Sequence, residues 1–279
     1  MLDDVTFTFI GPGVMAEAMA GRLIDTTGVS PDHIIMSGPH EKRLADLKTA
    51  YGVLTATSNT DAVQNADVVI LSVKPQSLQG VLDELKGAIS PEALVLSIVA
   101  GARCHAISAG LAHEAVVRSM PNTPAQVGQG ITVWTASPAV GDVHKGYARE
   151  TLKSFGEEVF VEKEEYLDMA TALSGTGPAY VFLFMEAMVD AGVHLGFPRR
   201  IAEKLVVQTV KGSVAYYEDS PSHLARLRNK VTSPGGTSAA ALYYLEKAGV
   251  RTAISRAIWA AFERSIELGR GERGDIQSE

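Results

Sequence analysis

A glycine-rich turn near the start of the chain constrains the fold more than any other feature. The apolar run 5–10 has the composition of a buried strand, and it leads directly into residues 11–16, which read G-P-G-V-M-A. In this G-x-G-x-x-A fingerprint the first glycine allows a tight turn, the second lets the backbone approach a pyrophosphate, and the alanine lets a helix pack on the sheet. Helical signals then continue to about Gly28. The pattern predicts a dinucleotide site formed by Ile10, Gly11, Pro12, Gly13, Val14, Met15 and Ala16.

Strand and helix patterns alternate through the next 120 or so residues, which is typical of a doubly wound parallel sheet of the Rossmann type. Such sheets bind ligands beyond the carboxyl ends of their strands. The predicted strands cover residues 33–36, 67–71, 94–98, 115–118 and 130–134, and the predicted helices cover residues 40–51 and 77–86.

The rule on strand ends selects three loops, at residues 72–76, 99–101 and 120–124. Lys74 directly precedes Pro75, and we favour a backbone contact with the cofactor there over a role as a catalytic acid. Asn122 lies between two prolines and is interpreted as a rigid wall of the cleft.

The end of the second strand bears on which cofactor is used, because an acid there would bind the ribose 2′-hydroxyl of NAD. This chain has Ser37 at that point, and Lys42 and Arg43 follow. A hydroxyl with cations favours a 2′-phosphate, and therefore NADP over NAD. Two alternatives stay open: Glu41 is able to point inward, and the cations are also explained as solvent-facing helix residues.

From about residue 162 strand signals vanish and five helical segments run to the end. In the segment 178–195 the polar positions Glu186, Asp190 and His194 form one narrow stripe on an otherwise apolar helix. Helices this apolar cannot all be covered within one small bundle, so subunit association is expected. We therefore divide the chain into an NAD(P)-binding domain at 1–162 and an all-α dimerisation domain at 163–279.

The segment from Val231 to Leu245, V-T-S-P-G-G-T-S-A-A-A-L-Y-Y-L, places hydroxyls and two glycines at the start of an alanine-rich helix. Free N–H groups at a helix start, reinforced by the helix dipole, bind carboxylate or phosphate. An ordinary capped helix explains the same residues, and the local sequence does not separate the two interpretations.

The composition excludes several classes of function. The net charge of −7, without a cluster of Lys and Arg, argues against nucleic acid as a partner. The single cysteine, Cys104, suits a reducing compartment, and we see no targeting peptide, so a cytoplasmic location is expected. The longest uninterrupted apolar run, 179–185, is too short to cross a bilayer, so no membrane contact is predicted. The seven histidines are scattered without a metal-binding spacing, and no metal is predicted.

Five motifs together resemble those of the pyrroline-5-carboxylate reductase family. They are F-I-G-P-G-V-M-A-E-A-M at 9–19, S-V-K-P-Q at 72–76, R-S-M-P-N-T-P-A at 118–125, A-L-S-G-T-G-P-A-Y at 172–180 and V-T-S-P-G-G-T-S at 231–238. They occur in the family's order and span essentially the full length. The resemblance implies NAD(P)H-dependent reduction of 1-pyrroline-5-carboxylate to L-proline, with NADPH as cofactor and NADH possible. It also implies a homodimer that forms higher oligomers such as a decamer.

The resemblance also implies roles for individual residues. Ser238 would be the catalytic contact to the ring nitrogen of the substrate. No histidine or carboxylate in these motifs stands out as a general acid, so we expect the substrate to arrive already protonated, as an iminium. Two departures from the family matter: Ser238 stands where threonine is usual, and Lys230 stands where many members have asparagine. The implied substrate-binding residues are Ser233, Gly235, Gly236, Thr237, Ser238 and Glu165. The implied cofactor contacts, besides residues 10–16, are Ser37, Arg43, Asn59, Val73, Lys74, Pro75, Ala100 and Gly101.

Two other functions compete with this one. A related NADP-dependent imine or β-hydroxyacid reductase would place a catalytic lysine or aspartate on the long helix after the sheet, whereas the polar stripe there contains no lysine. A non-catalytic NADP-sensing oligomer would keep the fingerprint but has no reason to keep residues 233–238.

Overall fold

The computed structural model describes residues 2–270, and its contacts divide them into two compact units. Unit 1 comprises Met1–Thr176 and Ala260–Glu279, and unit 2 comprises Gly177–Trp259. We describe each unit by itself. Residues 271–279 of the predicted second domain lie outside the described part of the chain.

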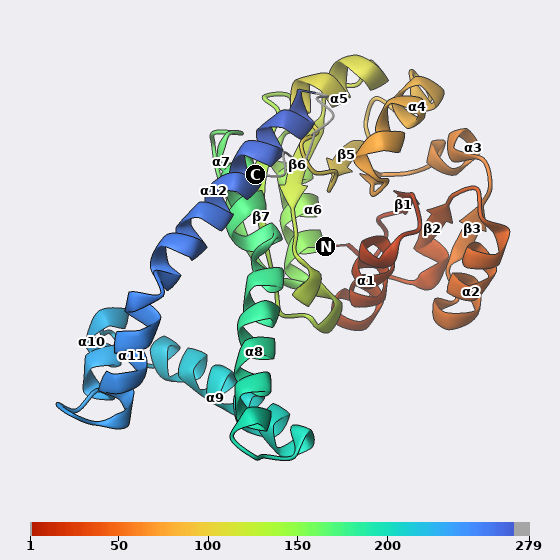
Figure 1. Ribbon diagram of the computed structural model, residues 1–279. Helices are drawn as coiled ribbons and strands as arrows, with labels where there is room; N and C mark the ends of the chain where they lie inside the picture. The colour runs from red at the N-terminus through yellow and green to blue at the C-terminus, as the bar shows by residue number, and fades with distance from the viewer. Residues whose placement is uncertain (1, 271–279) are drawn as a thin grey trace. The chain divides into compact units, whose positions relative to one another are not determined.

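Unit 1 is built on a sheet whose eight described strands have the order β3-β2-β1-β4-β5-β6-β7-β8 (Figure 1). Neighbouring strands are parallel, except that β7 runs antiparallel to β6. The chain reverses its direction of winding between β1 and β4, which is where a doubly wound sheet binds its ligand. The strands are β1 (Phe7–Ile10), β2 (Ile34–Ser37), β3 (Leu54–Ala56), β4 (Val68–Leu71), β5 (Leu94–Ser97), β6 (Val116–Met120), β7 (Gly130–Ala136) and β8 (Gly156–Phe160).

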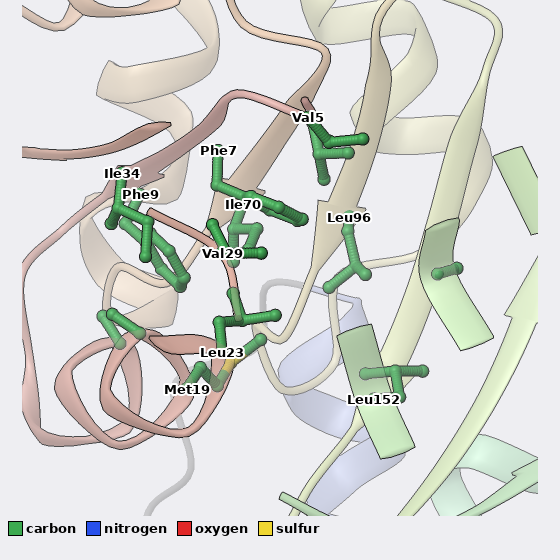
Figure 2. Packing of buried hydrophobic residues seen from close by; sticks show 14 of the residues in the cluster. Val5, Phe7, Phe9, Met19, Leu23, Val29, Ile34, Ile70, Leu96 and Leu152 are labelled. Carbon is green, nitrogen blue, oxygen red and sulfur yellow. The ribbon is translucent and has the colours of Figure 1, made fainter. Parts of the chain in front are cut away.

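Helices cover both faces of this sheet. Successive strand residues point to opposite sides, and the apolar residues on each side are buried under helices. Phe7 and Phe9 of β1 belong to a core that includes Met19 of α1 and Leu152 of α6 (Figure 2). Ile10 belongs to the second core, with residues of α3, α4 and α5. The helices are α1 (Val14–Arg22), continued by a π-helical turn (Leu23–Thr27), α2 (Glu41–Tyr51), α3 (Asn59–Val63), α4 (Pro75–Leu85), α5 (Cys104–Leu111) and α6 (Asp142–Lys153).

Comparison with the expected elements confirms the Rossmann-type order and shows two misjudgements. The sheet is not wholly parallel, since β7 is antiparallel to β6. The short edge strand β3 and the partly exposed strand β8 were missed, together with α5 and α6. Strands β3 and β8 have mixed apolar and polar residues and only partial burial, so neither produces the apolar run by which the central strands were recognised.

The compact units divide the chain after Thr176 and after Trp259, whereas the domain boundary at residue 162 stays a prediction. Helix α7 (Tyr166–Ala170) and the π-helical turn Thr171–Gly175 belong to unit 1, as does the end of α12 (Val250–Gly269). The physical reason is a buried carboxylate, Asp168, which pairs with Arg118 of the sheet.

Unit 2 contains only helices. Its described core is small: Val189, Ala202 and Val206 are buried between α8 and α9, and Gly192 allows the two helices to approach closely. Many large apolar side chains of this unit are exposed, among them Phe182, Leu183, Tyr244 and Trp259. The helices are α8 (Gly177–His194), α9 (Arg199–Glu218), α10 (Leu224–Lys230), α11 (Thr237–Lys247) and the first part of α12.

One described helical stretch, Tyr166–His194, is long and apolar enough to cross a membrane by length and composition. Counting only the uninterrupted run 179–185 underestimated it, because α7, the π-helical turn and α8 follow one another with only Thr176 between the last two. Such a helix also arises in a soluble protein whose apolar face is covered by another chain.

Candidate functional site

The fingerprint turn has the backbone geometry that a pyrophosphate site requires. Gly11 has a φ of +96°, and its N–H donates to the Ser37 carbonyl at 2.9 Å. Gly13 is the N-cap of α1 and has no side-chain cap, and a Cβ added there would meet nothing within 4 Å. The first N–H groups of the helix therefore face an open approach, which fits a phosphate.

The switch point between β1 and β4 is held together by Ser72. Its Oγ donates to the carbonyls of Ile10 and Gly11, at 3.0 and 2.9 Å, and its N–H donates to Ile10 at 2.9 Å. Val73 lies so close to Gly11 that an added Cβ would come within 2.7 Å of its Cγ1. The structure thus brings two of the predicted cofactor segments into direct contact.

Lys74 and Pro75 follow at the same edge of the sheet. Lys74 has an extended backbone and an exposed side chain, and α4 begins at Pro75. The predicted contact through the backbone is compatible with this geometry, because the side chain is not directed into the protein interior.

At the end of β2 two predicted cofactor residues contact each other. The Ser37 hydroxyl is buried and donates to Oδ1 of Asn59 at 2.7 Å, and Nδ2 of Asn59 donates to Glu84 at 2.8 Å. Asn59 is the first residue of α3, as expected. Ser37 therefore fixes the orientation of the Asn59 amide at the edge where an adenosine ribose would lie.

The guanidinium of Arg43, which was predicted to bind a phosphate, already has partners within the protein. Its Nε donates to the Pro12 carbonyl at 2.9 Å, and its Nη2 forms an ion pair with Glu17. Tyr51 donates to the other oxygen of Glu17 at 3.2 Å, and burial together with this carboxylate raises the pKa of Tyr51. The predicted phosphate-binding cation thus already has a carboxylate partner, which no sequence motif revealed.

The loop after β5 is packed against the end of α12. Gly101 has a φ of +75°, and an added Cβ would lie 2.9 Å from the backbone nitrogen of Gly269. Ala100 is half-buried beside it. The predicted nicotinamide loop therefore rests on the last turn of α12, the last helix in the described part of the chain.

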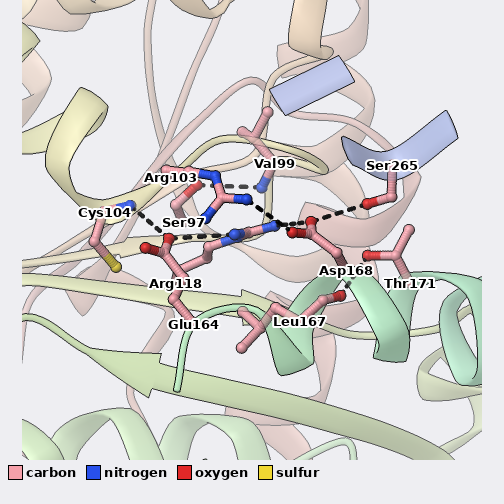
Figure 3. Close-up of polar contacts among 10 residues, drawn as sticks. All are labelled: Ser97, Val99, Arg103, Cys104, Arg118, Glu164, Leu167, Asp168, Thr171 and Ser265. Atoms are coloured by element: carbon pink, nitrogen blue, oxygen red, sulfur yellow. Dashed lines mark hydrogen bonds and ion pairs between the residues drawn. The ribbon is translucent and has the colours of Figure 1, made fainter. Parts of the chain in front are cut away.

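A buried ion network lies next to this loop (Figure 3). Arg118 of β6 bonds Asp168 at 2.9 Å and Glu164 at 3.2 Å, while Arg103, the N-cap of α5, bonds Asp168 at 3.2 Å. Ser265 of α12 donates to Asp168 at 3.0 Å. Sequence reasoning missed this network, although an arginine inside a predicted strand needs a buried acid and so was a usable signal.

Cys104 joins the same network through its backbone. Its N–H donates to Glu164 at 2.7 Å. Burial, with a smaller effect of Glu164, raises the pKa of the Cys104 thiol to about 12. The thiol is therefore protonated and unreactive at neutral pH.

The acid predicted to approach substrate does not belong to this network. Glu165 is exposed and precedes α7 without a side-chain capping bond, whereas its neighbour Glu164 binds Arg118 and the start of α5. Glu165 is therefore free of the structural role that its neighbour fills.

Asn122 has the structural role expected of it. Its Nδ2 donates to the Ser174 carbonyl at 3.2 Å, and its Oδ1 accepts from the Ile131 N–H at 3.0 Å. The side chain thereby joins the loop after β6 to β7 and to the π-helical turn.

In unit 2 the predicted anion-binding segment forms a helix start. Gly235 has a φ of +70°, Gly236 is the N-cap of α11 without a side-chain cap, and the helix begins at Thr237. The Ser233 hydroxyl lies against Gly236, where an added Cβ would come within 2.5 Å of its Oγ. Ser233 is exposed and Ser238 half-buried. The exposed hydroxyl and the uncapped N–H groups fit a carboxylate ligand.

Comparisons with known proteins cover both parts of the chain. Residues 164–268 match a family described as pyrroline-5-carboxylate reductase dimerisation, and residues 6–101 match one described as NADP oxidoreductase, coenzyme F420-dependent. The pyrroline-5-carboxylate reductase of Synechocystis sp. is 43% identical over 94% of this chain and 97% of its own length. That of Pseudomonas aeruginosa is 40% identical over 93% of this chain and 95% of its own length.

Solved structures give the same result. The pyrroline carboxylate reductase of Plasmodium falciparum, solved with NADP bound, superposes with a TM-score of 0.89 at 32% identity, covering 96% of this chain and 99% of the other. The structure from Coxiella burnetii gives 0.86 at 36% identity, covering 97% and 99%. A prephenate dehydrogenase, at 13% identity and a TM-score of 0.52, shares only the fold.

Proposed function

The chain belongs to the pyrroline-5-carboxylate reductase family, and we infer that it reduces 1-pyrroline-5-carboxylate to L-proline with a nicotinamide cofactor, the final step of proline biosynthesis. The observation that carries this inference is the pairing of two open helix starts in one chain. Gly13 opens one at the sheet edge and Gly236 opens the other in the helical unit, and neither has a side-chain cap. One fits a pyrophosphate and the other a carboxylate.

We propose that the cofactor is NADPH, with NADH as an alternative. Residues 10–16 would hold the pyrophosphate, Ser37 and Arg43 the 2′-phosphate, and Asn59 the adenosine ribose. Val73, Lys74, Pro75, Ala100 and Gly101 would flank the nicotinamide, which supplies a hydride when bound. The open approach at Gly13 and the close packing of Gly11 on Val73 support this assignment.

For the substrate we propose a carboxylate site at the start of α11. The backbone N–H groups of Gly235 and Thr237 and the Ser233 hydroxyl would bind the carboxylate, beside Gly236, whose own N–H donates to the Ser233 carbonyl at 3.1 Å. The Ser238 hydroxyl would hydrogen-bond the ring nitrogen. Glu165 would approach the ligand from the segment before α7. Because the hydroxyl and backbone N–H groups at the start of α11 are not general acids, and nothing singles out Glu165 for that role, we propose that the ring nitrogen arrives protonated and that the protein acts by orientation.

We further propose that the protein is a homodimer that assembles into higher oligomers such as a decamer. The small core of unit 2 and its many exposed apolar side chains support association, and the matched dimerisation family covers this region. The same association accounts for the apolar stretch Tyr166–His194 without a membrane. Native mass spectrometry would measure the subunit number, and a monomer at micromolar concentration would contradict this proposal.

We also propose a soluble cytoplasmic enzyme whose active site is shared between subunits. A mixed dimer that combines a Gly13→Ala subunit with a Ser233→Ala subunit tests the sharing. If the site is shared, one of the two sites in the mixed dimer contains neither substitution, and activity is recovered. If the mixture shows only the sum of the activities of the two separate variants, the site is not shared.

The deciding experiment follows the absorbance of NADPH after addition of pyrroline-5-carboxylate, with NADH and with the reverse reaction from proline as further arms. Substrate-dependent oxidation is the expected result. Turnover of other imines or β-hydroxyacids in its absence would favour a related reductase. Bound NADPH without any turnover in the folded protein would favour a cofactor-sensing oligomer.

A further inference from the structure

We propose that Glu17 is a specificity-determining residue that weakens the preference of this chain for a 2′-phosphate by neutralising Arg43. The inference rests on the proposed function, since it assigns the end of β2 to the adenosine end of the cofactor. Glu17 lies on α1, outside the loop after β2 from which the choice between NADP and NAD is usually read.

Arg43 is placed at the fingerprint turn by its own bonds. Its Nε donates to the Pro12 carbonyl at 2.9 Å, inside the G-P-G turn. Gly38, which follows β2, packs on the same residue, because an added Cβ would lie 2.5 Å from Pro12 Cδ. The guanidinium thus lies where the turn after β2 meets the turn after β1, the expected place of the ribose that carries the 2′-phosphate.

Glu17 occupies the other side of this guanidinium. It comes one turn after Gly13 on α1, forms an ion pair with Nη2 of Arg43 and accepts from the Tyr51 hydroxyl at 3.2 Å. The side chains of Arg43 and Glu17 are 33% and 29% exposed, so solvent and a ligand reach both. The pair presents no net charge to an incoming phosphate.

The consequence for binding follows from Coulomb's law. A 2′-phosphate carries up to two negative charges, and a carboxylate held near it in water-like surroundings opposes its binding by about three- to tenfold in affinity. NADH lacks this phosphate, and any effect of Glu17 on the pyrophosphate is shared by the two cofactors and cancels in the ratio of their affinities. Glu17 therefore reduces the difference in affinity between NADPH and NADH without contacting the nicotinamide.

A test that does not depend on turnover measures binding of 2′,5′-ADP and 5′-AMP by calorimetry to the wild type and to Glu17→Gln. The glutamine oxygen can accept from Arg43, while its NH2 group faces the Tyr51 hydroxyl as a donor, so the side-chain shape is kept and the negative charge is removed. We expect affinity for 2′,5′-ADP to rise about three- to tenfold, with a gain that shrinks at high salt, and affinity for 5′-AMP to stay unchanged. The ratio of KM for NADH to KM for NADPH should rise by the same factor.

Two further variants separate the possible failures. Asp46→Asn removes one exposed carboxylate from α2, the helix of Arg43, and should leave both affinities unchanged. Arg43→Gln should lower affinity for 2′,5′-ADP about tenfold or more and spare 5′-AMP. If Arg43→Gln has this effect and Glu17→Gln lowers or does not change 2′,5′-ADP binding, Glu17 only orients the arginine and the inference is overturned. If Arg43→Gln spares both nucleotides, the proposed 2′-phosphate site itself is wrong.

Discussion

The hydroxyl of Ser265 donates a 3.0 Å hydrogen bond to Oδ1 of Asp168, which lies 97 residues earlier in the chain. The same carboxylate binds Arg118 of β6 and Arg103 at the start of α5. One buried acid thereby ties α12 to the sheet and to α5, the helix that follows the predicted nicotinamide loop (Figure 3). The predictions below begin from this contact.

Replacing Asp168 by asparagine should destabilise the fold strongly. The change removes the buried carboxylate charge at 2.9 Å from Arg118 and leaves Glu164, at 3.2 Å, as the remaining ion-pair partner of this guanidinium, so the free energy of unfolding should fall by up to about 3–5 kcal/mol. Ser265→Ala removes one hydrogen bond and should lower it by about 1 kcal/mol. Asp190→Asn, which breaks an exposed pair with Arg199, is the matched control and should change little. Urea denaturation measures all three, and equal effects would contradict the ranking.

Two glycine substitutions should differ in their effect on stability. Gly101→Ala forces a side chain onto a φ of +75° and against Gly269, so we expect about 1–3 kcal/mol of destabilisation. Gly13→Ala adds a methyl group that meets no protein atom within 4 Å, and the melting temperature should hardly change. Its Cβ would instead obstruct the pyrophosphate, so NADPH affinity should fall at least tenfold by calorimetry. Unchanged NADPH affinity would count against the proposed site.

The Cys104 thiol should react slowly with alkylating reagents. Burial raises its pKa from 9.0 to about 12, so the thiolate fraction near pH 8 is about a thousandfold smaller than for an ordinary thiol of this reference pKa. Iodoacetamide labelling followed by mass spectrometry should give near-complete modification in urea and very little in buffer. Equal rates in the two conditions would show that the thiol is exposed.

The free energy of unfolding should fall as the pH drops below about 6.5, because of His113. Burial lowers the pKa of this ring below 6.5, while its Nε2 is bonded to the Ala93 carbonyl. In the unfolded chain the ring takes up a proton near pH 6.5, so the stabilising contribution is complete above that pH. It is lost as pH falls towards the lower pKa of the folded state. His113→Gln should flatten the dependence of the melting temperature between about pH 7.5 and pH 5, and an unchanged slope would assign it to other groups.

Substitutions at Ser238 test the role of its hydroxyl. If the substrate arrives as an iminium, Ser238→Ala should reduce kcat/KM only about tenfold and leave the acidic limb of the pH–rate profile in place. Ser238→Thr keeps the hydroxyl on a stiffer rotamer and should retain or raise activity. A loss of several orders of magnitude in Ser238→Ala would make this hydroxyl part of the proton transfer.

Local sequence patterns determined much of the fold and of the candidate cofactor site. The apolar run before Gly11, the spacing to Ala16 and the alternation of elements predicted the sheet and its ligand-binding edge, because burial on both faces leaves a continuous apolar signal. The helix start at Thr237 was also predictable, since glycines and hydroxyls before an alanine-rich run are a local signal. The sequence did not predict the hydrogen bond between Ser37 and Asn59, although both residues were expected at the adenosine end of the cofactor.

Only the tertiary structure decided which charges meet. Asp168 with Arg118, and Glu17 with Arg43, are 50 and 26 residues apart, and no periodicity relates them. The same holds for Gly269, whose place against Gly101 depends on a helix that returns to the sheet. The sequence determines where strands, turns and helix starts form because these depend on neighbouring residues. The pairing of buried charges and the boundary between the compact units depend on side chains that only the folded chain brings within bonding distance.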